Sequence, residues 1–323
     1  MAKIQVSETV KLNLYTLMRK TRATEDRIVS LYRQGHIVGG VYTSRGMEAT
    51  TVASASALDA EDYLFPIHRD LGAHIAKGQS VLNILLQYLG RGTSLTRGRD
   101  SGIHASDTSL NIIGNVSHLG AMIPVAVGVA MASKLRGDKV VSLNYIGEGG
   151  SNIGDFHEGL NFASVQQLPF VLIIENNQYA YSTPTHKGYR CEKLSHRANA
   201  YCIPGHFIDG TDALTVYSTV RSAVERARRG EGPSLIECRS MRMVGHSAHD
   251  DASYVDKKLL KEWEQKDPIA NLEKKLLDEG ILDRDKIEQI GRDIEQDIDA
   301  ATEDALAAPH PEAGWAGQGV FAD

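Results

Sequence analysis

The chain has 323 residues, of which 42% are hydrophobic and 24% are charged, values typical of a globular protein with one large domain or two ordinary ones. The formal net charge of −6 argues against a general nucleic-acid-binding protein, which would usually be basic. No run of about 18 apolar residues is present, so we expect no membrane span.

Cysteine usage and the N-terminus bear on the compartment. Cys191, Cys202 and Cys238 are scattered without metal-ligand spacing and form no Cys-x-x-Cys pair. This usage is typical of reduced thiols in a reducing compartment. MAKIQVSETV lacks the apolar core of a secretory signal, and Glu8 is unusual in an acid-poor transit peptide. We therefore expect a cytoplasmic protein.

The first third of the chain predicts mainly helices. Apolar residues recur at helical spacing over 8–34, with Ser7 as the N-cap and Gly35 as the stop. A glycine turn and a helix of small residues follow in GGVYTSRGMEATTVASASAL, and small residues favour a buried helix. Next come a short buried strand, DYLFP, a helix beginning in HRDLGAHIAKG, an amphipathic helix over 79–89 and the loop GRGTSLTRGRDSGIH.

The centre of the chain alternates strands with helices. The predicted strands are KVVSLNYI, FVLIIE and SLIECRS, and the predicted helices are AMIPVAVGVAMASKLRG, DFHEGLNFASVQQ and TVYSTVRSAVERARRG. Such alternation predicts an α/β fold, with a parallel sheet covered by helices on both faces. Charged helices follow over 256–306, so we predict a single α/β domain over 1–306 and a tail over 307–323.

The turn after KVVSLNYI carries the most informative residues. The strand ends at Ile146, and Gly147-Glu148-Gly149-Gly150 follows at once. Ligands of open parallel sheets bind at the carboxyl ends of strands, where glycines let backbone N–H groups approach a phosphate. A carboxylate beside a diphosphate is repulsive unless a cation lies between them. A hard cation such as Mg²⁺ takes oxygen ligands from protein, phosphate and water, so Glu148 predicts a metal.

A second polar cluster follows the next strand. FVLIIE is followed by Asn176-Asn177, so Asn177 can supply a second metal oxygen and the carbonyl of Tyr179 a third. Alone, either piece has an ordinary interpretation, a glycine turn with a solvated Glu or a turn made by two Asn residues. A dinucleotide fingerprint is incomplete because Asn152 replaces its third glycine. Together, at neighbouring strand ends, the two clusters predict a metal–diphosphate site.

The pairing of GEG with ENN resembles the motif of proteins that bind thiamine diphosphate. GEGGSNIGDFHEGLNFASVQQLPFVLIIENNQYAYSTP is similar to the alpha subunits of pyruvate, branched-chain 2-oxo acid and acetoin dehydrogenases, and the similarity runs from about residue 10 to about residue 300. It implies the thiamine-diphosphate-binding fold, Mg²⁺ held by Glu148, Asn177 and the Tyr179 carbonyl, and a diphosphate touched by Gly149 and Gly150.

Two further segments gain a role from the resemblance. Arg69 opens a helix after a buried strand and would otherwise be an ordinary exposed arginine; it matches the family's phosphate-binding arginine, and His68 stands where many members have Tyr. VGHSAHDDASY resembles the family's mobile active-site loop. This match assigns His246 to cofactor phosphate and substrate, whereas we interpret His249 as an incidental loop residue. A histidine that titrates near neutrality suits proton handling.

The remaining candidates line the expected cofactor and substrate. In SHLGAMIP, the resemblance assigns the Ser117 carbonyl to the aminopyrimidine ring and Leu119 to the wedge that bends the cofactor. Some branched-chain enzymes hold a potassium ion here with Thr and Gln; Ala121 and Met122 occupy those positions, so we expect none. Tyr42 matches a substrate-facing position that is often His, and a packed aromatic at a turn is the alternative.

The resemblance implies oxidative decarboxylation of a 2-oxo acid with acyl transfer to a lipoyl-bearing acyltransferase. Activation needs a buried Glu against a pyrimidine nitrogen, and the chain offers no good candidate, since Glu48 is the only Glu that the pattern predicts to be buried. The resemblance implies that a separate beta subunit supplies this Glu in an alpha-2 beta-2 assembly. YAYSTPT and Tyr42 favour branched-chain substrates, whereas HRDLGAHIAKG is nearer to pyruvate or acetoin enzymes. Acetoin cleavage, an NAD-binding oxidoreductase and a non-catalytic subunit are the alternatives.

Overall fold

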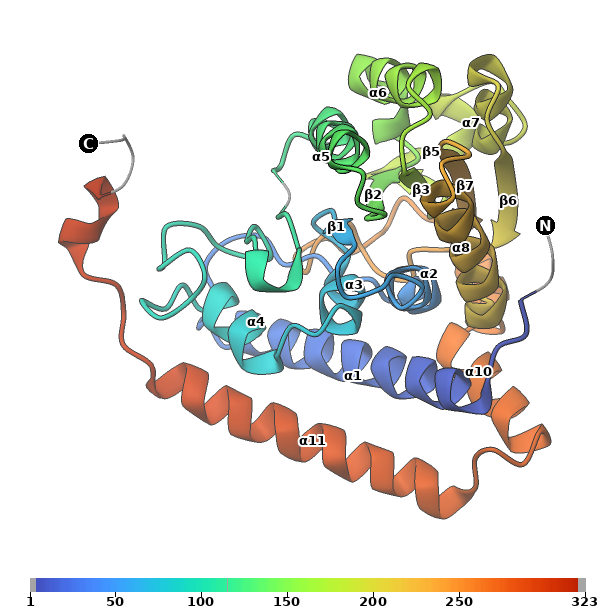
Figure 1. Cartoon of the computed structure of the whole chain (residues 1–323). Helices are drawn as coiled ribbons and strands as arrows, with labels where there is room; N and C mark the ends of the chain where they lie inside the picture. Colours follow the sequence, from blue (N-terminus) through green and yellow to red (C-terminus); the bar gives the residue numbers. More distant parts are fainter. Residues whose placement is uncertain (1–3, 115, 319–323) are drawn as a thin grey trace.

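The computed structural model describes residues 4–114 and 116–318, and a five-stranded parallel sheet lies at its centre (Figure 1). Its strands are β1 (Tyr63–Phe65), β2 (Ser142–Gly147), β3 (Phe170–Asn176), β6 (Gly205–Asp209) and β7 (Ser234–Arg239), in the order β1-β2-β3-β7-β6. Beyond β3, the short strands β4 (Tyr179–Ala180) and β5 (Thr183–Pro184) form an antiparallel pair. The sequence did not predict β6, a half-exposed edge strand without a continuous apolar run.

Helices cover both faces of the sheet, as the sequence predicted. On one face, α2 (Glu48–Ala55) and α8 (Ala213–Arg228) pack over strand side chains that include Leu143 and Ile173. On the other, α5 (Met122–Arg136) and α6 (Gly154–Val165) cover Ile146 and Leu172. Alternate residues of each strand point to opposite faces, so both sides of these central strands are apolar.

Two long helices lie side by side below the sheet (Figure 1). They are α1 (Glu8–Arg33), capped by Ser7 as expected, and α11 (Arg284–Ala307). Gly35 follows α1 with a φ of +81°, which favours glycine. The other helices are α3 (Leu71–Ala76), α4 (Val81–Tyr88), α7 (Thr185–Gly188), α9 (Lys257–Glu264) and α10 (Pro268–Asp278), with 3-10 turns η1 (Thr108–Leu110), η2 (Gly150–Asn152), η3 (Leu194–Tyr201) and η4 (Ala313–Gly317). All of α2 is buried, as its small residues predicted.

The segment after α11 packs against the Gly- and Arg-rich loop. Arg91 contacts the His310 ring at 2.8 Å, and Arg99 donates to the Trp315 carbonyl at 2.8 Å. Residues 319–323 of the predicted tail lie outside the described residues, and the division into one domain and a tail stays a prediction. Across 4–114 and 116–318, every helix is too short or too polar to cross a bilayer.

Candidate functional site

The predicted site residues surround two adjoining cavities at the carboxyl edge of the sheet. β2 and β3 pair in parallel with Gly147 opposite Glu175, so both strand ends open into a cavity of about 300 Å³. Nine predicted residues line this first cavity: His68, Arg69, Leu119, Glu148, Gly149, Gly150, Asn177, Tyr179 and His246. The other two, Tyr42 and Ser117, line a second cavity of about 500 Å³, which shares His68, Leu119 and His246 with the first.

Glu148 and Asn177 come together as the strand-end argument predicted. The Asn177 backbone N–H donates to Glu148 Oε2 at 3.3 Å, whereas the buried Glu148 Oε1 has no partner among the described residues. Burial raises the pKa of Glu148 to about 7. The Tyr179 carbonyl accepts from Arg242 Nη1 at 3.1 Å and keeps a second lone pair. One carboxylate, one amide and one carbonyl are a fitting donor set for Mg²⁺.

Gly149 and Gly150 leave no space for side chains. A Cβ on Gly149 would lie 2.5 Å from the Ala180 Cβ, and a Cβ on Gly150 would lie 2.7 Å from the Ile146 Cδ1. Gly149 is the N-cap of η2, Gly150 is its first residue, and α6 begins at Gly154. Backbone N–H groups at the start of a helix form favourable sites for phosphate, so this turn suits a diphosphate.

Arg69 reaches the cavity from the turn that precedes α3. Its Nη1 donates to the Thr43 carbonyl at 2.8 Å, and its Nη2 donates to the His246 carbonyl at 3.0 Å. Burial and the nearby charge of Arg242 lower the pKa of Arg69 to about 10. Because carbonyl groups fix the guanidinium without neutralising it, Arg69 retains an unbalanced positive charge suited to phosphate.

Arg242 is a second buried arginine of the first cavity, and the sequence analysis missed it. Its guanidinium donates to the carbonyls of Tyr179 and Tyr181 and to the Tyr254 hydroxyl, at distances of 3.1, 2.8 and 2.7 Å. Arg242 follows the end of β7, which lies beside β3, but the order of the strands cannot be read from the chain. The strand-end rule applied to SLIECRSMRM would have identified it as a candidate.

Charges of both signs therefore face one buried space without neutralising each other. Arg69 and Arg242 donate to neutral groups, while Glu148 keeps an oxygen without a partner among the described residues. Unpaired buried charges are unfavourable, and a ligand that carries both an anion and a cation relieves both costs. A metal–diphosphate complex has this charge pattern.

His246 lies between two tyrosine rings at the junction of the cavities. Its ring centroid is 5.2 Å from that of Tyr42 and 4.6 Å from that of Tyr181. The His246 amide donates to Asp250 Oδ2 at 2.6 Å, which fixes the loop locally. Burial and the charge of Arg69 lower the pKa of His246 to about 4, so its imidazole is neutral at pH 7.

The loop around His246 has a small apolar anchor that the sequence analysis did not anticipate. Met241, Val255 and Trp263 form a buried cluster, and Met243 and Tyr254 pack against it. The anchor lies at the two ends of the loop rather than under His246. The mobility of the loop without cofactor stays a prediction.

The second cavity holds a histidine that the sequence analysis also missed. His104 Nδ1 lies 3.4 Å from Asp100 Oδ1, and its Nε2 lies 3.4 Å from Ser117 Oγ. Tyr42 packs edge-on against His68 with centroids 4.9 Å apart, so it is both a packed aromatic and a residue that lines the cavity. His104 lies in a loop rich in Gly, Arg and Ser, where no periodic pattern distinguishes a cavity residue.

The expectation that Glu48 alone is buried was wrong. Glu25, Glu148, Glu175 and Glu237 are also buried, because helix-facing and strand-end carboxylates were not recognised from the pattern. Glu48 lines neither cavity; it accepts from Arg22 at 2.7 Å and from the Gly46 amide at 2.9 Å.

Glu175 lines the first cavity, and its carboxyl group shares a hydrogen bond with that of Asp70. Burial, together with Asp70, raises the pKa of Glu175 well above its usual value. It adds a further buried carboxyl group to the edge of the sheet that carries Glu148.

The fold and the site define an α/β protein with a cavity lined by buried charged groups at the carboxyl edge of its parallel sheet. The family model described as "Dehydrogenase E1 component" matches residues 15–314. The chain therefore belongs to the dehydrogenase E1 family, as an alpha-type subunit of the thiamine-diphosphate-dependent 2-oxo acid dehydrogenases.

Three curated relatives align with this chain over most of its length and over at least three quarters of their own. The 2-oxoisovalerate dehydrogenase subunit alpha of Bacillus subtilis is 38% identical over 303 residues, which are 93% of this chain and 91% of the relative. The subunit alpha of acetoin:2,6-dichlorophenolindophenol oxidoreductase from the same species is 35% identical over 95% of this chain and 92% of the relative. The pyruvate dehydrogenase E1 component subunit alpha of Staphylococcus aureus is 38% identical, over 88% and 75%.

Proposed function

We propose that the first cavity binds Mg²⁺ and the diphosphate of thiamine diphosphate. Glu148, Asn177 and the Tyr179 carbonyl hold the metal, and Arg69 with Arg242 binds the diphosphate oxygens. The observation that carries the proposal is the buried Glu148 Oε1, which has no partner among the described residues although two arginines line the same cavity. The glycine turn contributes backbone N–H groups to the diphosphate.

The residues shared by the two cavities would hold the rest of the cofactor. Leu119 lines both cavities, which supports its role as the wedge, and Ser117 lines the second, where its carbonyl meets the aminopyrimidine. When bound, thiamine diphosphate supplies the nucleophile and the electron sink for decarboxylation. The protein orients it and excludes water. A bound anion would raise the pKa of His246 toward neutrality, so this histidine can then hold or move a proton beside the substrate.

The substrate in this proposal is a branched-chain 2-oxo acid, bound in the second cavity beside Tyr42, His104 and His246. Tyr42 replaces the histidine of many pyruvate and acetoin enzymes and gives the wall an apolar ring. The acyl group is then transferred to the lipoyl group of an acyltransferase partner. Similarity to a 2-oxoisovalerate dehydrogenase subunit supports this assignment, although pyruvate and acetoin relatives are similar too.

A beta subunit completes the site in an alpha-2 beta-2 assembly. Among the described residues of the second cavity, the carboxylate is Asp100, and it faces His104. Glu48 is occupied by Arg22 and Gly46 and lines neither cavity, which supports an activating Glu from the partner. The relatives are named as alpha subunits, which supports this proposal. The three cysteines are free, which suits a cytoplasmic enzyme.

Reconstitution tests the proposed function. The chain is purified alone and with its beta partner, and each preparation is assayed with branched-chain 2-oxo acids, pyruvate and acetoin. We expect turnover only by the reconstituted pair, with the highest kcat/KM for a branched-chain 2-oxo acid. Turnover by the isolated chain would refute the shared active site. Quenching of nicotinamide fluorescence without thiamine diphosphate binding would instead favour an NAD-binding oxidoreductase.

A further inference from the structure

Residues 41–47 form an irregular segment beneath the His246 loop, and we call it the support segment. The Ala248 amide donates to the Val41 carbonyl at 2.9 Å, and the Met243 amide donates to the Arg45 carbonyl at 3.1 Å. Arg69 connects the two layers, since it donates to Thr43 and to His246. A shift of the support segment would therefore move the loop, the phosphate-binding arginine and Tyr42 together.

Two buried carboxylates hold the support segment from the other side. Glu25 of α1 accepts from both the amide and the hydroxyl of Ser44, each at 2.8 Å. Glu48 of α2 accepts from the Gly46 amide at 2.9 Å and pairs with Arg22 at 2.7 Å. Glu25 and Glu48 are 3% and 0% exposed, so these bonds are shielded from water.

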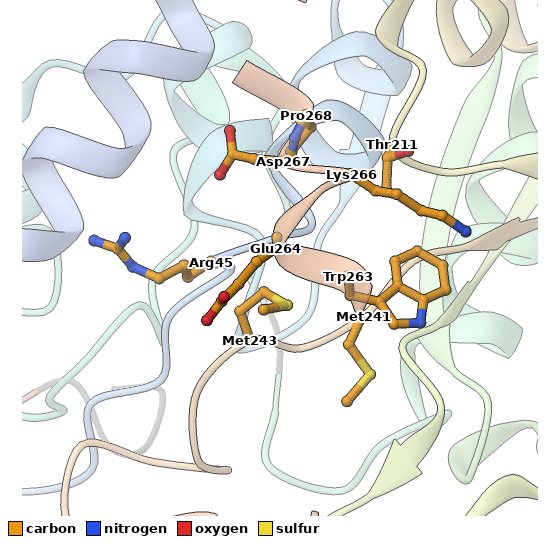
Figure 2. A pocket seen from close by; sticks show the side chains of 10 residues that line it. Arg45, Thr211, Met241, Met243, Trp263, Glu264, Lys266, Asp267 and Pro268 are labelled. Atoms are coloured by element: carbon orange, nitrogen blue, oxygen red, sulfur yellow. The ribbon is translucent and has the colours of Figure 1, made fainter. Parts of the chain in front are cut away.

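Packing fixes one end of the support segment only in part. Gly46 has a φ of +90°, and a Cβ there would lie 2.4 Å from the Met241 carbonyl, so the two chain segments cross closely at this point. Beside this crossing is a hollow of about 190 Å³. Figure 2 shows the side chains of Met241, Met243 and Trp263 around it. The crossing is thus close at Gly46 and borders a hollow on one side, and hydrogen bonds add to packing in determining where the segment lies.

We propose that Glu25 and Glu48 are positioning residues for the cofactor site. They hold the support segment in the position in which Arg69 and His246 face the first cavity. Neither carboxylate lines a cavity that the cofactor would enter, so both act through Ser44 and Gly46. Burying a carboxylate is unfavourable unless donors satisfy it. Apolar side chains would fill the same space without that cost, so two buried carboxylates that bind one irregular segment indicate a role in positioning it. The effect on the cofactor rests on the proposed function, whereas the effect on the loop does not.

Hydrogen–deuterium exchange of the full chain without cofactor tests the positioning. In Glu25→Ala, we expect the amides of residues 243–250 to exchange on the order of tenfold faster, while those of α5 stay unchanged. Glu25→Gln keeps an acceptor for Ser44 and should restore the slow exchange. Ser44→Ala removes only the hydroxyl bond and should give a smaller increase, and it serves if Glu25→Ala does not fold.

The matched control is Glu273→Gln on α10. It weakens the hydrogen bond that Glu273 accepts from the hydroxyl of Tyr15, which lies on α1, the helix that carries Glu25, and away from the support segment. It should leave exchange over 243–250 unchanged. Equal exchange in Glu25→Ala and Glu273→Gln, or no rescue by Gln, would overturn the proposal.

Calorimetry of the same variants with thiamine diphosphate and Mg²⁺ then separates the two claims. Wild-type chain, with its beta partner, that binds no thiamine diphosphate would defeat the proposed function and leave the exchange result intact. If the wild type binds, turnover assays of the chain with its beta partner provide the second readout. Glu25→Ala should lower kcat by an order of magnitude or more, with a smaller change in KM, because small displacements of binding groups are costly to catalysis. Full kcat in a variant whose loop exchanges faster would overturn the positioning role.

Discussion

Two groups of buried glutamates, one beside the support segment and one at the edge of the sheet, differ in their surroundings. Beside the support segment, Glu25 and Glu48 accept hydrogen bonds from Ser44, Gly46 and Arg22. At the edge of the sheet, Glu148 has one oxygen without a partner among the described residues, and Glu175 shares a hydrogen bond with the acid Asp70 rather than accepting from N–H donors. The residue type and the burial are the same, and only the supply of donors differs.

This difference separates structural from ligand-binding carboxylates. A buried carboxylate that receives internal donors stabilises the chain that it holds, whereas one without donors destabilises the fold until an external partner arrives. Removal of the first kind should therefore lower stability. Removal of the second kind should leave stability unchanged or raise it and should abolish binding.

The largest expected effect on stability is that of Glu48→Ala. The substitution removes the buried acceptor of the Gly46 amide and leaves Arg22 paired with Asp267, and breaking a buried ion pair in this way costs up to about 3–5 kcal/mol. The free energy of unfolding from urea titration measures the change. Glu279→Ala removes the more exposed pair with Lys11 and should cost less than about 1 kcal/mol. Equal losses of unfolding free energy in Glu48→Ala and Glu279→Ala would contradict the structural role of Glu48.

The next effect concerns binding, through Arg69→Lys. The variant keeps the charge but cannot donate to Thr43, His246 and a phosphate oxygen together, because a lysine lacks the planar fork of donors. We expect thiamine diphosphate to bind about 10- to 100-fold more weakly, the equivalent of about 1.4–2.8 kcal/mol, with little change in the free energy of unfolding. Isothermal titration calorimetry gives the dissociation constant. Unchanged affinity would show that the diphosphate does not contact this guanidinium.

The sequence predicted the residues whose positions follow from strand ends. KVVSLNYI and FVLIIE are adjacent along the chain and in the sheet, so the order of elements alone was enough to place Glu148 beside Asn177. The sequence did not predict Arg242 because its place at the cavity depends on β7 lying beside β3. It did not predict Glu175 because the side chain at the end of β3 that faces the cavity is fixed only by the fold. Glu25 escaped because a carboxylate inside an amphipathic helix predicts a solvated face; its burial depends on Ser44, which is distant in the sequence.

A smaller effect concerns pH and sharpens the comparison at Glu25. Burial raises its folded-state pKa from 4.5 to about 8, so the folded chain retains a proton that the unfolded chain has lost. The resulting stability is complete below pH 4.5 and is lost as pH rises through about 8. Between about pH 6 and about pH 8, wild-type stability should fall more steeply than that of Glu25→Gln, by up to about 1.4 kcal/mol per pH unit. Parallel curves from urea titrations would contradict a protonated Glu25.

Calorimetric titration of wild type and Glu148→Gln with thiamine diphosphate, each with the beta partner and with or without Mg²⁺, tests the central claim most directly. The variant retains the size of the side chain and loses its charge. We predict Mg²⁺-dependent binding by the wild type, and binding at least about 100-fold weaker by the variant despite an equal or higher free energy of unfolding. Equal Mg²⁺-dependent affinity in the two proteins would contradict the account, since the unpaired carboxylate would then not be the metal ligand.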